Sequence, residues 1–203
     1  MHRPLEAFCF LSRELRSLSV APTSIWFAQA LDPESPALNL GQYLEIFGQV
    51  DPPLFEVAMR RVMSATDAFN VHFVETDVGP QQYFSPDPNG VIRVLDFSGE
   101  PDPRAAVHEW MHDDMSRAIN IERGPTFTLA LLQCAPDRFF YYQRVHHIVA
   151  DGASGLLLAQ RVVASYSALV TGEPAHPVDY GSLLDLLDEE EEYRASVRYG
   201  RGR

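Results

Sequence analysis

The stretch covering residues 126–172 constrains the fold of this chain more than any other part of the sequence. Thr126–Cys134 and Phe139–His146 are rich in aromatic and aliphatic residues, which predicts two neighbouring strands joined by a short turn. Apolar residues then recur at helical spacing over Leu156–Val170, and Gly172 predicts the end of that helix. A paired strand that runs into a long helix favours the α/β class.

The rest of the chain repeats this mixture of strands and helices. Asp51 precedes two prolines and predicts the N-cap of a helix with Leu54, Ala58, Val62 and Ala65 on one face. The apolar pattern predicts further helices at Ser24–Leu31 and Pro103–Ile119, strands at Leu40–Phe47 and Val91–Leu95, and a hairpin of Phe69–Glu75 with Gln81–Phe84. We therefore expect a mixed β-sheet flanked by helices.

Charge and composition exclude several classes of function. The 203 residues hold 28 acidic and 16 basic side chains, a net charge of -12, which repels nucleic acid and anionic membrane surfaces. Cys9 and Cys134 are too few for a disulfide framework or a zinc cluster. The N-terminus lacks the pattern of a secretory signal, and we expect no membrane-spanning stretch. These features predict a cytoplasmic protein.

Two adjacent histidines end the second predicted strand. Strand side chains alternate, so His146 lies on the face of Arg144 and His147 on the face of Val145. Histidine titrates near neutral pH, which suits one of the pair to take a proton from an attacking amine or hydroxyl. One of the two histidines is therefore a candidate general base.

The residues that follow the histidines are typical of a turn into a helix. Asp151 can hold the shape of this turn, and Gly152 permits backbone conformations that other residues resist. Ser154 is interpreted as a helix cap, since it lacks the Gly-x-Ser-x-Gly surroundings of a nucleophile. Two alternatives stay open from the residues alone: a purely structural His-His pair, and a metal site formed by His147 and Asp151 if both lay on one helix face.

The run His146-His147-Ile148-Val149-Ala150-Asp151-Gly152 resembles the HHxxxDG signature of condensation domains from nonribosomal peptide synthetases. Leu18-Ser19-Val20-Ala21 and Ile25-Trp26-Phe27 resemble the first motif of that family. Tyr142-Gln143-Arg144 and Gly172-Glu173-Pro174 resemble its siderophore branch, of the enterobactin-synthetase type. The resemblance runs along the first of the family's two chloramphenicol-acetyltransferase-like lobes, with residues 1–178 as the N-terminal lobe and 179–203 as an acidic linker or helix.

The resemblance also implies an activity and partners. Such a domain forms an amide between an upstream acyl thioester and the amine of a downstream aminoacyl thioester, both carried on phosphopantetheine, and binds no cofactor directly. The implied partners are donor and acceptor carrier domains, the second lobe and a downstream adenylation domain. His147 is the implied catalytic histidine, as base or by positioning the amine, and the N–H of Gly152 is available to an oxyanion. His146 and Asp151 are implied to support the site.

Two departures from the family pattern lead to further expectations. Asn70 stands where the family carries an arginine that pairs with the signature aspartate, so we expect Asp151 to pair with Arg144 or Arg61. Pro22 and Ser24 replace a glutamine and an arginine of the first motif. We expect the lobe alone to be inactive or to act only as a docking module for carrier proteins. Epimerisation or ester formation within the same superfamily stays an alternative, and the siderophore-like features suggest an aryl donor.

Overall fold

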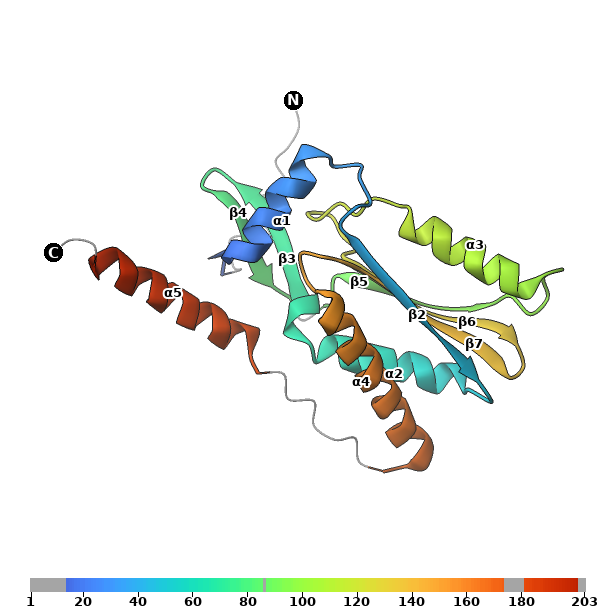
Figure 1. Ribbon diagram of the computed structural model, residues 1–203. Coiled ribbons are helices and arrows are strands. Elements are labelled where there is room, and N and C mark those ends of the chain that lie inside the picture. Colours follow the sequence, from blue (N-terminus) through green and yellow to red (C-terminus); the bar gives the residue numbers. More distant parts are fainter. Residues whose placement is uncertain (1–13, 86, 174–180, 201–203) are drawn as a thin grey trace, which may run out of the picture.

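The computed structural model describes residues 14–85, 87–173 and 181–200 (Figure 1). Predictions on Cys9, on the N-terminal segment before residue 14 and on the boundary at 178/179 lie outside these residues. The elements run in the order β1 (Arg16–Ser17), α1 (Val20–Leu31), β2 (Asn39–Phe47), α2 (Pro52–Ser64), the 3-10 helix η1 (Asp67–Asn70), β3 (Val71–Thr76), β4 (Gly79–Phe84), β5 (Gly90–Asp96), α3 (Pro103–Met115), β6 (Phe127–Ala135), β7 (Arg138–His146), α4 (Gly152–Thr171) and α5 (Leu183–Gly200).

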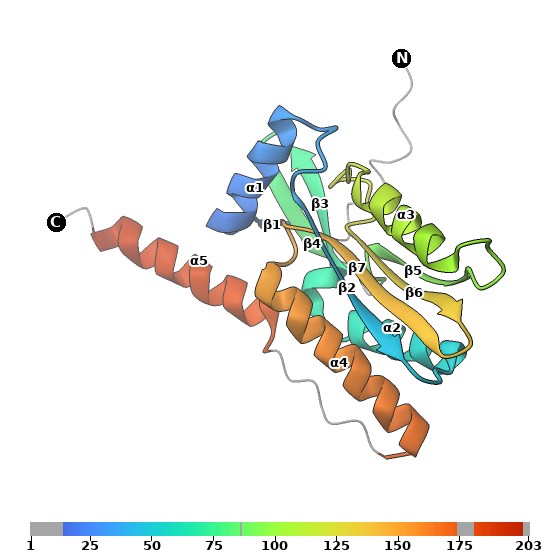
Figure 2. The same ribbon diagram turned by 45° about the vertical axis from the view of Figure 1, so that its right-hand side comes forward.

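The main sheet has the strand order β2-β7-β6-β5, antiparallel except for the parallel pair β5–β6. Strand β7 lies inside the sheet, and its side chains alternate between two cores. Phe139 and Tyr141 pack with α2 and α4 on one face, whereas Phe140 and Tyr142 pack with α3 on the other. The predicted mixed sheet flanked by helices is therefore confirmed, with helices on both of its faces (Figure 2).

A second, smaller sheet lies beside the first and has the order β1-β4-β3. Its β3–β4 hairpin is the one predicted from the sequence, and Asp77 and Val78 form the turn. Helix α1 packs on this sheet through Trp26 and Phe73, whose ring centroids are 6.3 Å apart. Ile148, from the loop after β7, joins the same apolar cluster and so ties this loop to the small sheet.

The ends of three helices differ from those predicted, and the first of them, α1, begins at Val20 ahead of the predicted Ser24. Helix α2 is capped by Asp51 and buries Ala58 and Val62 as expected. Its buried face also includes Phe55, Met59 and Met63, whereas Ala65 is exposed. Helix α3 ends at Met115, before the predicted Ile119, because side chains from the sheet bind its last carbonyl groups. Helix α4 begins at Gly152, ahead of the predicted start near Ser154, because Asp151 caps it.

Helix α4 is long and apolar enough to cross a membrane by length and composition alone, a test that the core helix of a soluble protein also passes. It packs on α2 through Leu158, Ala159 and Val162. The opposite side of α4 keeps Leu156 and Val163 about half exposed, which explains the apolar composition of the helix as a whole.

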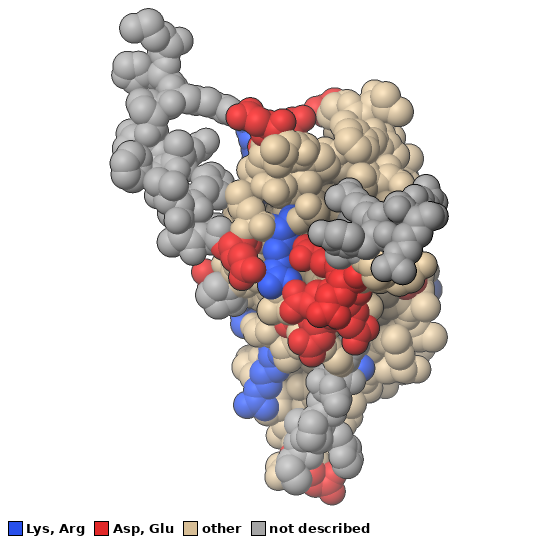
Figure 3. Space-filling model, turned by 90° about the vertical axis from the view of Figure 1, so that its left-hand side faces the viewer, with Lys and Arg blue, Asp and Glu red and all other residues tan. Residues whose placement is uncertain are grey.

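Helix α5 projects from the body of the molecule and is anchored at its first turn (Figure 2). The N–H of Leu183 donates to Asp67 at 3.0 Å, and a groove of about 520 Å³ lies between this turn, η1 and the start of α4. Acidic side chains gather on the face from which α5 projects (Figure 3). Arg16 forms ion pairs with Glu14 and with Asp188 of α5 there.

Candidate active site

His147 lies in the turn directly after β7 and is half-buried. Its ring Nδ1 is 3.0 Å from the carbonyl oxygen of Ala150, and its backbone N–H donates to the carbonyl of Leu38 at 2.9 Å. A carbonyl oxygen only accepts hydrogen bonds, so Nδ1 must carry the proton of the neutral ring. Nε2 then keeps its lone pair, and none of the described residues forms a hydrogen bond with it. In the neutral ring of His147, Nε2 is therefore the nitrogen that can accept a proton.

His146 has the opposite tautomer and is fully buried. The N–H of Ile148 donates to its Nδ1 at 3.1 Å, so the proton sits on Nε2, which lies 3.0 Å from Oε1 of Gln29. The Gln29 amide is itself oriented, because its Nε2 donates to the carbonyls of Asp32 and Ser35. Burial, together with the neighbouring His147, lowers the pKa of His146 to about 4, so this ring is neutral at physiological pH.

Asp151 is exposed and caps α4, which corrects its predicted pairing with an arginine. Its Oδ1 accepts hydrogen bonds from the N–H of Ser154 at 2.8 Å and from the Ser154 hydroxyl at 2.6 Å. These two bonds hold the pKa of the Asp151 carboxyl below its ordinary value. Arg144 instead pairs with Asp114 on the other face of the sheet, and Arg61 lies exposed on α2. The N-cap residue of α4 is therefore Asp151 and not the predicted Ser154, which donates hydrogen bonds to the Asp151 side chain.

Gly152 is the first residue of α4 and is exposed. It does not have the positive φ that only glycine adopts easily, so the predicted need for its backbone freedom is wrong. A Cβ added at this position would meet no atom within 4 Å, and the space beside it is open. The N–H groups of the first helical turn lack partners within the helix, so the N–H of Gly152 can donate to a ligand.

The remaining predicted residues lie apart from this turn. Asn70 is buried, and its Nδ2 donates to the carbonyl of Ser64 at 3.1 Å, while no described residue hydrogen-bonds its Oδ1. The metal alternative required His147 and Asp151 on one helix face, but α4 begins only after both residues. Within residues 14–85, 87–173 and 181–200, no three His, Cys, Asp or Glu side chains are grouped to hold a metal ion.

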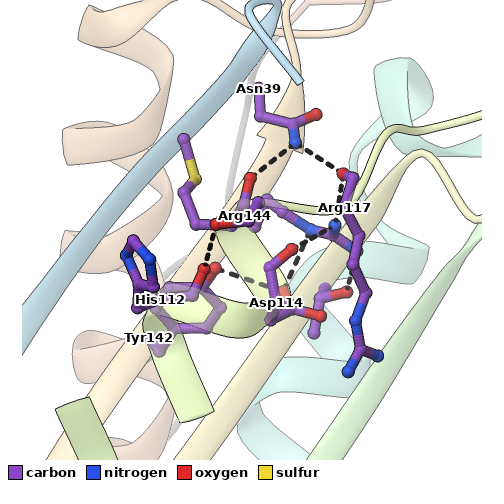
Figure 4. Close-up of polar contacts among 9 residues, drawn as sticks. Asn39, His112, Asp114, Arg117, Tyr142 and Arg144 are labelled. Atoms are coloured by element: carbon purple, nitrogen blue, oxygen red, sulfur yellow. Dashed lines mark hydrogen bonds and ion pairs between the residues drawn. The ribbon is translucent and has the colours of Figure 1, made fainter. Parts of the chain in front are cut away.

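Sequence reasoning missed the partners of two buried side chains near the turn, His146 and Arg144. Gln29, on α1, binds His146 across the boundary between the two sheets, and no local pattern marks it. Arg144 is buried in a network with Asp114 and Tyr142 beneath the end of β7 (Figure 4). The sequence did contain a signal for this network. Arg144 is a basic residue inside an apolar strand, and a buried guanidinium needs a hydrogen-bonding partner.

The fold and the site together define a class, a chloramphenicol-acetyltransferase-like lobe with a His-His-x-x-x-Asp-Gly loop between a central strand and a long helix. Residues 14–201 match the family model described as "Condensation domain". This chain therefore belongs to the condensation-domain family.

Known members of the family support the same assignment. The chain is 43% identical over 187 residues to a dimodular nonribosomal peptide synthase of Bacillus subtilis (strain 168), and this match covers 92% of the chain and 8% of the relative. It is 27% identical to enterobactin synthase component F of Shigella flexneri, covering 91% of the chain and 14% of the relative. The crystal structure of the starter condensation domain of rhizomide synthetase superposes with a TM-score of 0.86 at 39% identity, covering 93% of the chain and 46% of that domain.

Proposed function

We propose that this chain is the N-terminal lobe of an amide-forming condensation domain in which His147 is the general base. The observation that carries the proposal is the hydrogen bond from Nδ1 of His147 to the carbonyl of Ala150, which makes Nε2 the unprotonated nitrogen of the neutral ring. The chain spans less than half of the solved condensation domain it resembles. The reaction is therefore assigned to the domain that the chain forms with a second lobe.

The proposed step joins two thioesters carried on phosphopantetheine arms of carrier domains. The amine of the acceptor attacks the carbonyl carbon of the donor, forming the C–N bond while the carbonyl oxygen gains negative charge. His147 Nε2 takes the proton of the amine, and the N–H of Gly152 donates to the oxyanion. The C–S bond then breaks, the donor arm leaves as a thiolate and takes the proton from His147, and the amide stays on the acceptor arm.

His146 and Asp151 have supporting roles in this proposal. The neutral, buried ring of His146 joins the end of β7 to Gln29 and so orients the loop that carries His147. Asp151 fixes the start of α4, and with it the N–H of Gly152, through its bonds to Ser154. Neither side chain takes up or releases a proton during the reaction.

The surface beside the open edge of the main sheet supports a second lobe as partner. Within the described part of the chain, strand β2 pairs only with β7 and forms an edge of the main sheet. A Cβ at Gly155 of α4 would lie 3.2 Å from Gln42 of β2, so α4 borders this edge. Leu156, Val163 and Val170 recur every seven residues on α4 and are 54%, 41% and 56% exposed. An apolar stripe of this kind is typical of a surface that another domain covers.

The other partners follow from the same proposal. Donor and acceptor carrier domains deliver the substrates, an adenylation domain follows in the synthetase, and phosphopantetheine enters as part of the substrates without being a resident cofactor. We place the protein in the cytoplasm, where such substrates are made. The likeness to a starter condensation domain and to enterobactin synthase supports an acyl donor that starts a chain, with an aryl siderophore cap as the first candidate.

The test is amide formation by the domain completed with its second lobe, using loaded donor and acceptor carriers and mass spectrometry of the acceptor. We expect an aryl or other acyl amide on the acceptor arm, and no product when the 203-residue chain is used alone. A hydroxy-acid acceptor replaces the amino acid in a parallel reaction. Ester formation without amide formation would contradict the proposal.

A further inference from the structure

A buried arginine lies on β7 just before the histidine pair. Arg144 is 5% exposed, and its Nε lies 3.0 Å from Oδ2 of Asp114. Its Nη1 donates to the backbone carbonyls of Asp114 at 2.6 Å and Arg117 at 3.1 Å, and its Nη2 donates to Thr128 at 3.1 Å. A guanidinium is costly to bury unless it is paired, and here most of its contacts go to the C-terminal turn of α3.

A second side chain, from the neighbouring strand, binds the same turn. Nδ2 of Asn39 donates to the carbonyl of Met115 at 2.9 Å and to that of Arg117 at 2.8 Å (Figure 4). The carbonyl of Arg117 therefore accepts from both Asn39 and Arg144. We call the carbonyls of Asp114, Met115 and Arg117, together with the side chains of Asn39 and Arg144, the α3 clamp.

The α3 clamp holds the end of β7, from which the turn with His147 emerges, and the neighbouring first residue of β2. Asn39 is paired with His146 in the β2–β7 register. The residue before Asn39, Leu38, accepts the backbone N–H of His147 at 2.9 Å. Arg144 of the clamp thus lies two residues before His146 on β7. Asn39 of the clamp directly follows Leu38, the backbone partner of His147.

From this juxtaposition we infer that Arg144 and Asn39 are positioning residues, which fix the ring of His147 through the two strand ends. The inference rests on the catalytic role proposed for His147. It explains why a cation is buried where an apolar side chain would serve stability equally well, since replacing buried ion pairs by apolar groups is often neutral or stabilising. Catalysis is more sensitive than stability, because a displacement of about 1 Å can lower a rate by about a hundredfold.

The first measurement is the tautomer of His147 in the 203-residue chain, read from the ¹⁵N chemical shifts of its ring nitrogens. The variants are Asn39→Ala and Arg144→Lys, and the matched control is Arg138→Lys, at the opposite, more exposed end of β7. Thermal unfolding and circular dichroism check that each variant folds. We expect Nδ1–H in the parent and the control, and a mixture of both tautomers in Asn39→Ala and Arg144→Lys.

The second measurement is amide formation by the completed domain carrying the same substitutions. We expect kcat to fall about tenfold to a hundredfold in both clamp variants, with an unchanged KM for the acceptor carrier, because substrate binding does not involve the clamp. If Asn39→Ala, the milder change, folds and keeps both the tautomer and kcat, the inference is wrong. An equal effect in Arg138→Lys would also overturn it.

The catalytic role of His147 and the positioning role of the α3 clamp can be contradicted independently of each other. If His147→Ala keeps full activity while the clamp variants still change the tautomer, the catalytic role of His147 is wrong and the positioning of its ring stands. If His147→Ala is inactive and the clamp variants change neither readout, the catalytic role stands and Arg144 is a structural residue only.

Discussion

The two adjacent histidines differ in which ring nitrogen carries the proton. The carbonyl of Ala150 places it on Nδ1 of His147, whereas the N–H of Ile148 and the amide of Gln29 place it on Nε2 of His146. The first ring keeps a free basic nitrogen, and the second has both nitrogens occupied by protein groups. Local hydrogen bonds thus give two identical side chains different chemistry.

The buried state of His146 predicts a pH dependence of stability. Its pKa is about 4 in the folded chain against an ordinary value of 6.5, so the unfolded chain binds the proton more readily between these values. Stability is fully present above pH 6.5 and is lost as the pH falls toward 4. Urea unfolding should show that the parent loses about 2 kcal/mol more than His146→Gln between pH 7 and pH 5. Equal losses in the two proteins would show that His146 titrates normally.

Gly152 provides a separate test at the site. The space beside it is open, so Gly152→Ala should fold with an unchanged Tm. In the proposed reaction the new methyl group would intrude on the donor thioester. We expect condensation by the completed domain to fall about tenfold or more. Gly99→Ala, which also adds a methyl group in open space, is the control and should keep full activity. Full activity in Gly152→Ala would remove Gly152 from the site.

The sequence placed the candidate residues around one loop but did not predict their contacts. The strand alternation placed His146 on the face of Arg144, and both residues belong to β7, whereas His147 lies in the turn after β7, where strand alternation no longer applies. The partner of Asp151 was wrong for a reason in the same alternation. Arg144 points to the α3 face, whereas Asp151 begins α4 on the opposite face, so the two cannot meet.

At the scale of elements, the sequence predicted helix boundaries correctly where the capping residue is adjacent to the helix in the sequence. Asp51 and Gly172 were predicted as helix boundaries and are the N-cap of α2 and the C-cap of α4. The end of α3 was not predictable in this way, because Asn39 and Arg144, which bind its last carbonyls, lie 76 and 30 positions away in the sequence. Tertiary contacts decide such boundaries.

The pairing of β5 with β6 predicts a sensitive position in the main sheet. Gly90 lies opposite Phe127, and a Cβ at Gly90 would fall 2.1 Å from the Phe127 ring, which is fully buried. Gly90→Ala should therefore destabilise the chain by about 1–3 kcal/mol, because neither the ring nor the strand can move freely. Chemical denaturation measures this loss, with Gly99→Ala as the control. A loss no larger than that of the control would show that the β5–β6 pair adjusts.

At the scale of the whole molecule, the proposed function makes this lobe one half of a reaction chamber. His147 and Gly152 lie at the surface end of β7 and α4, and the open edge of β2 and the apolar stripe of α4 lie beside them. A second lobe on this surface would exclude water from the histidine and hold the two carrier arms in line. The fold class was predictable from strand and helix periodicity, but the exposure of this stripe required the packed structure.

The most direct measurement compares amide formation by the completed domain with that by its His147→Ala variant, using loaded donor and acceptor carriers. General-base catalysis typically contributes about 10²–10⁴-fold, so we expect the rate of the variant to fall by at least a hundredfold while its fold and its binding of both carriers stay intact. If the variant forms amide at the parent rate, His147 is not the base, and the central claim is wrong.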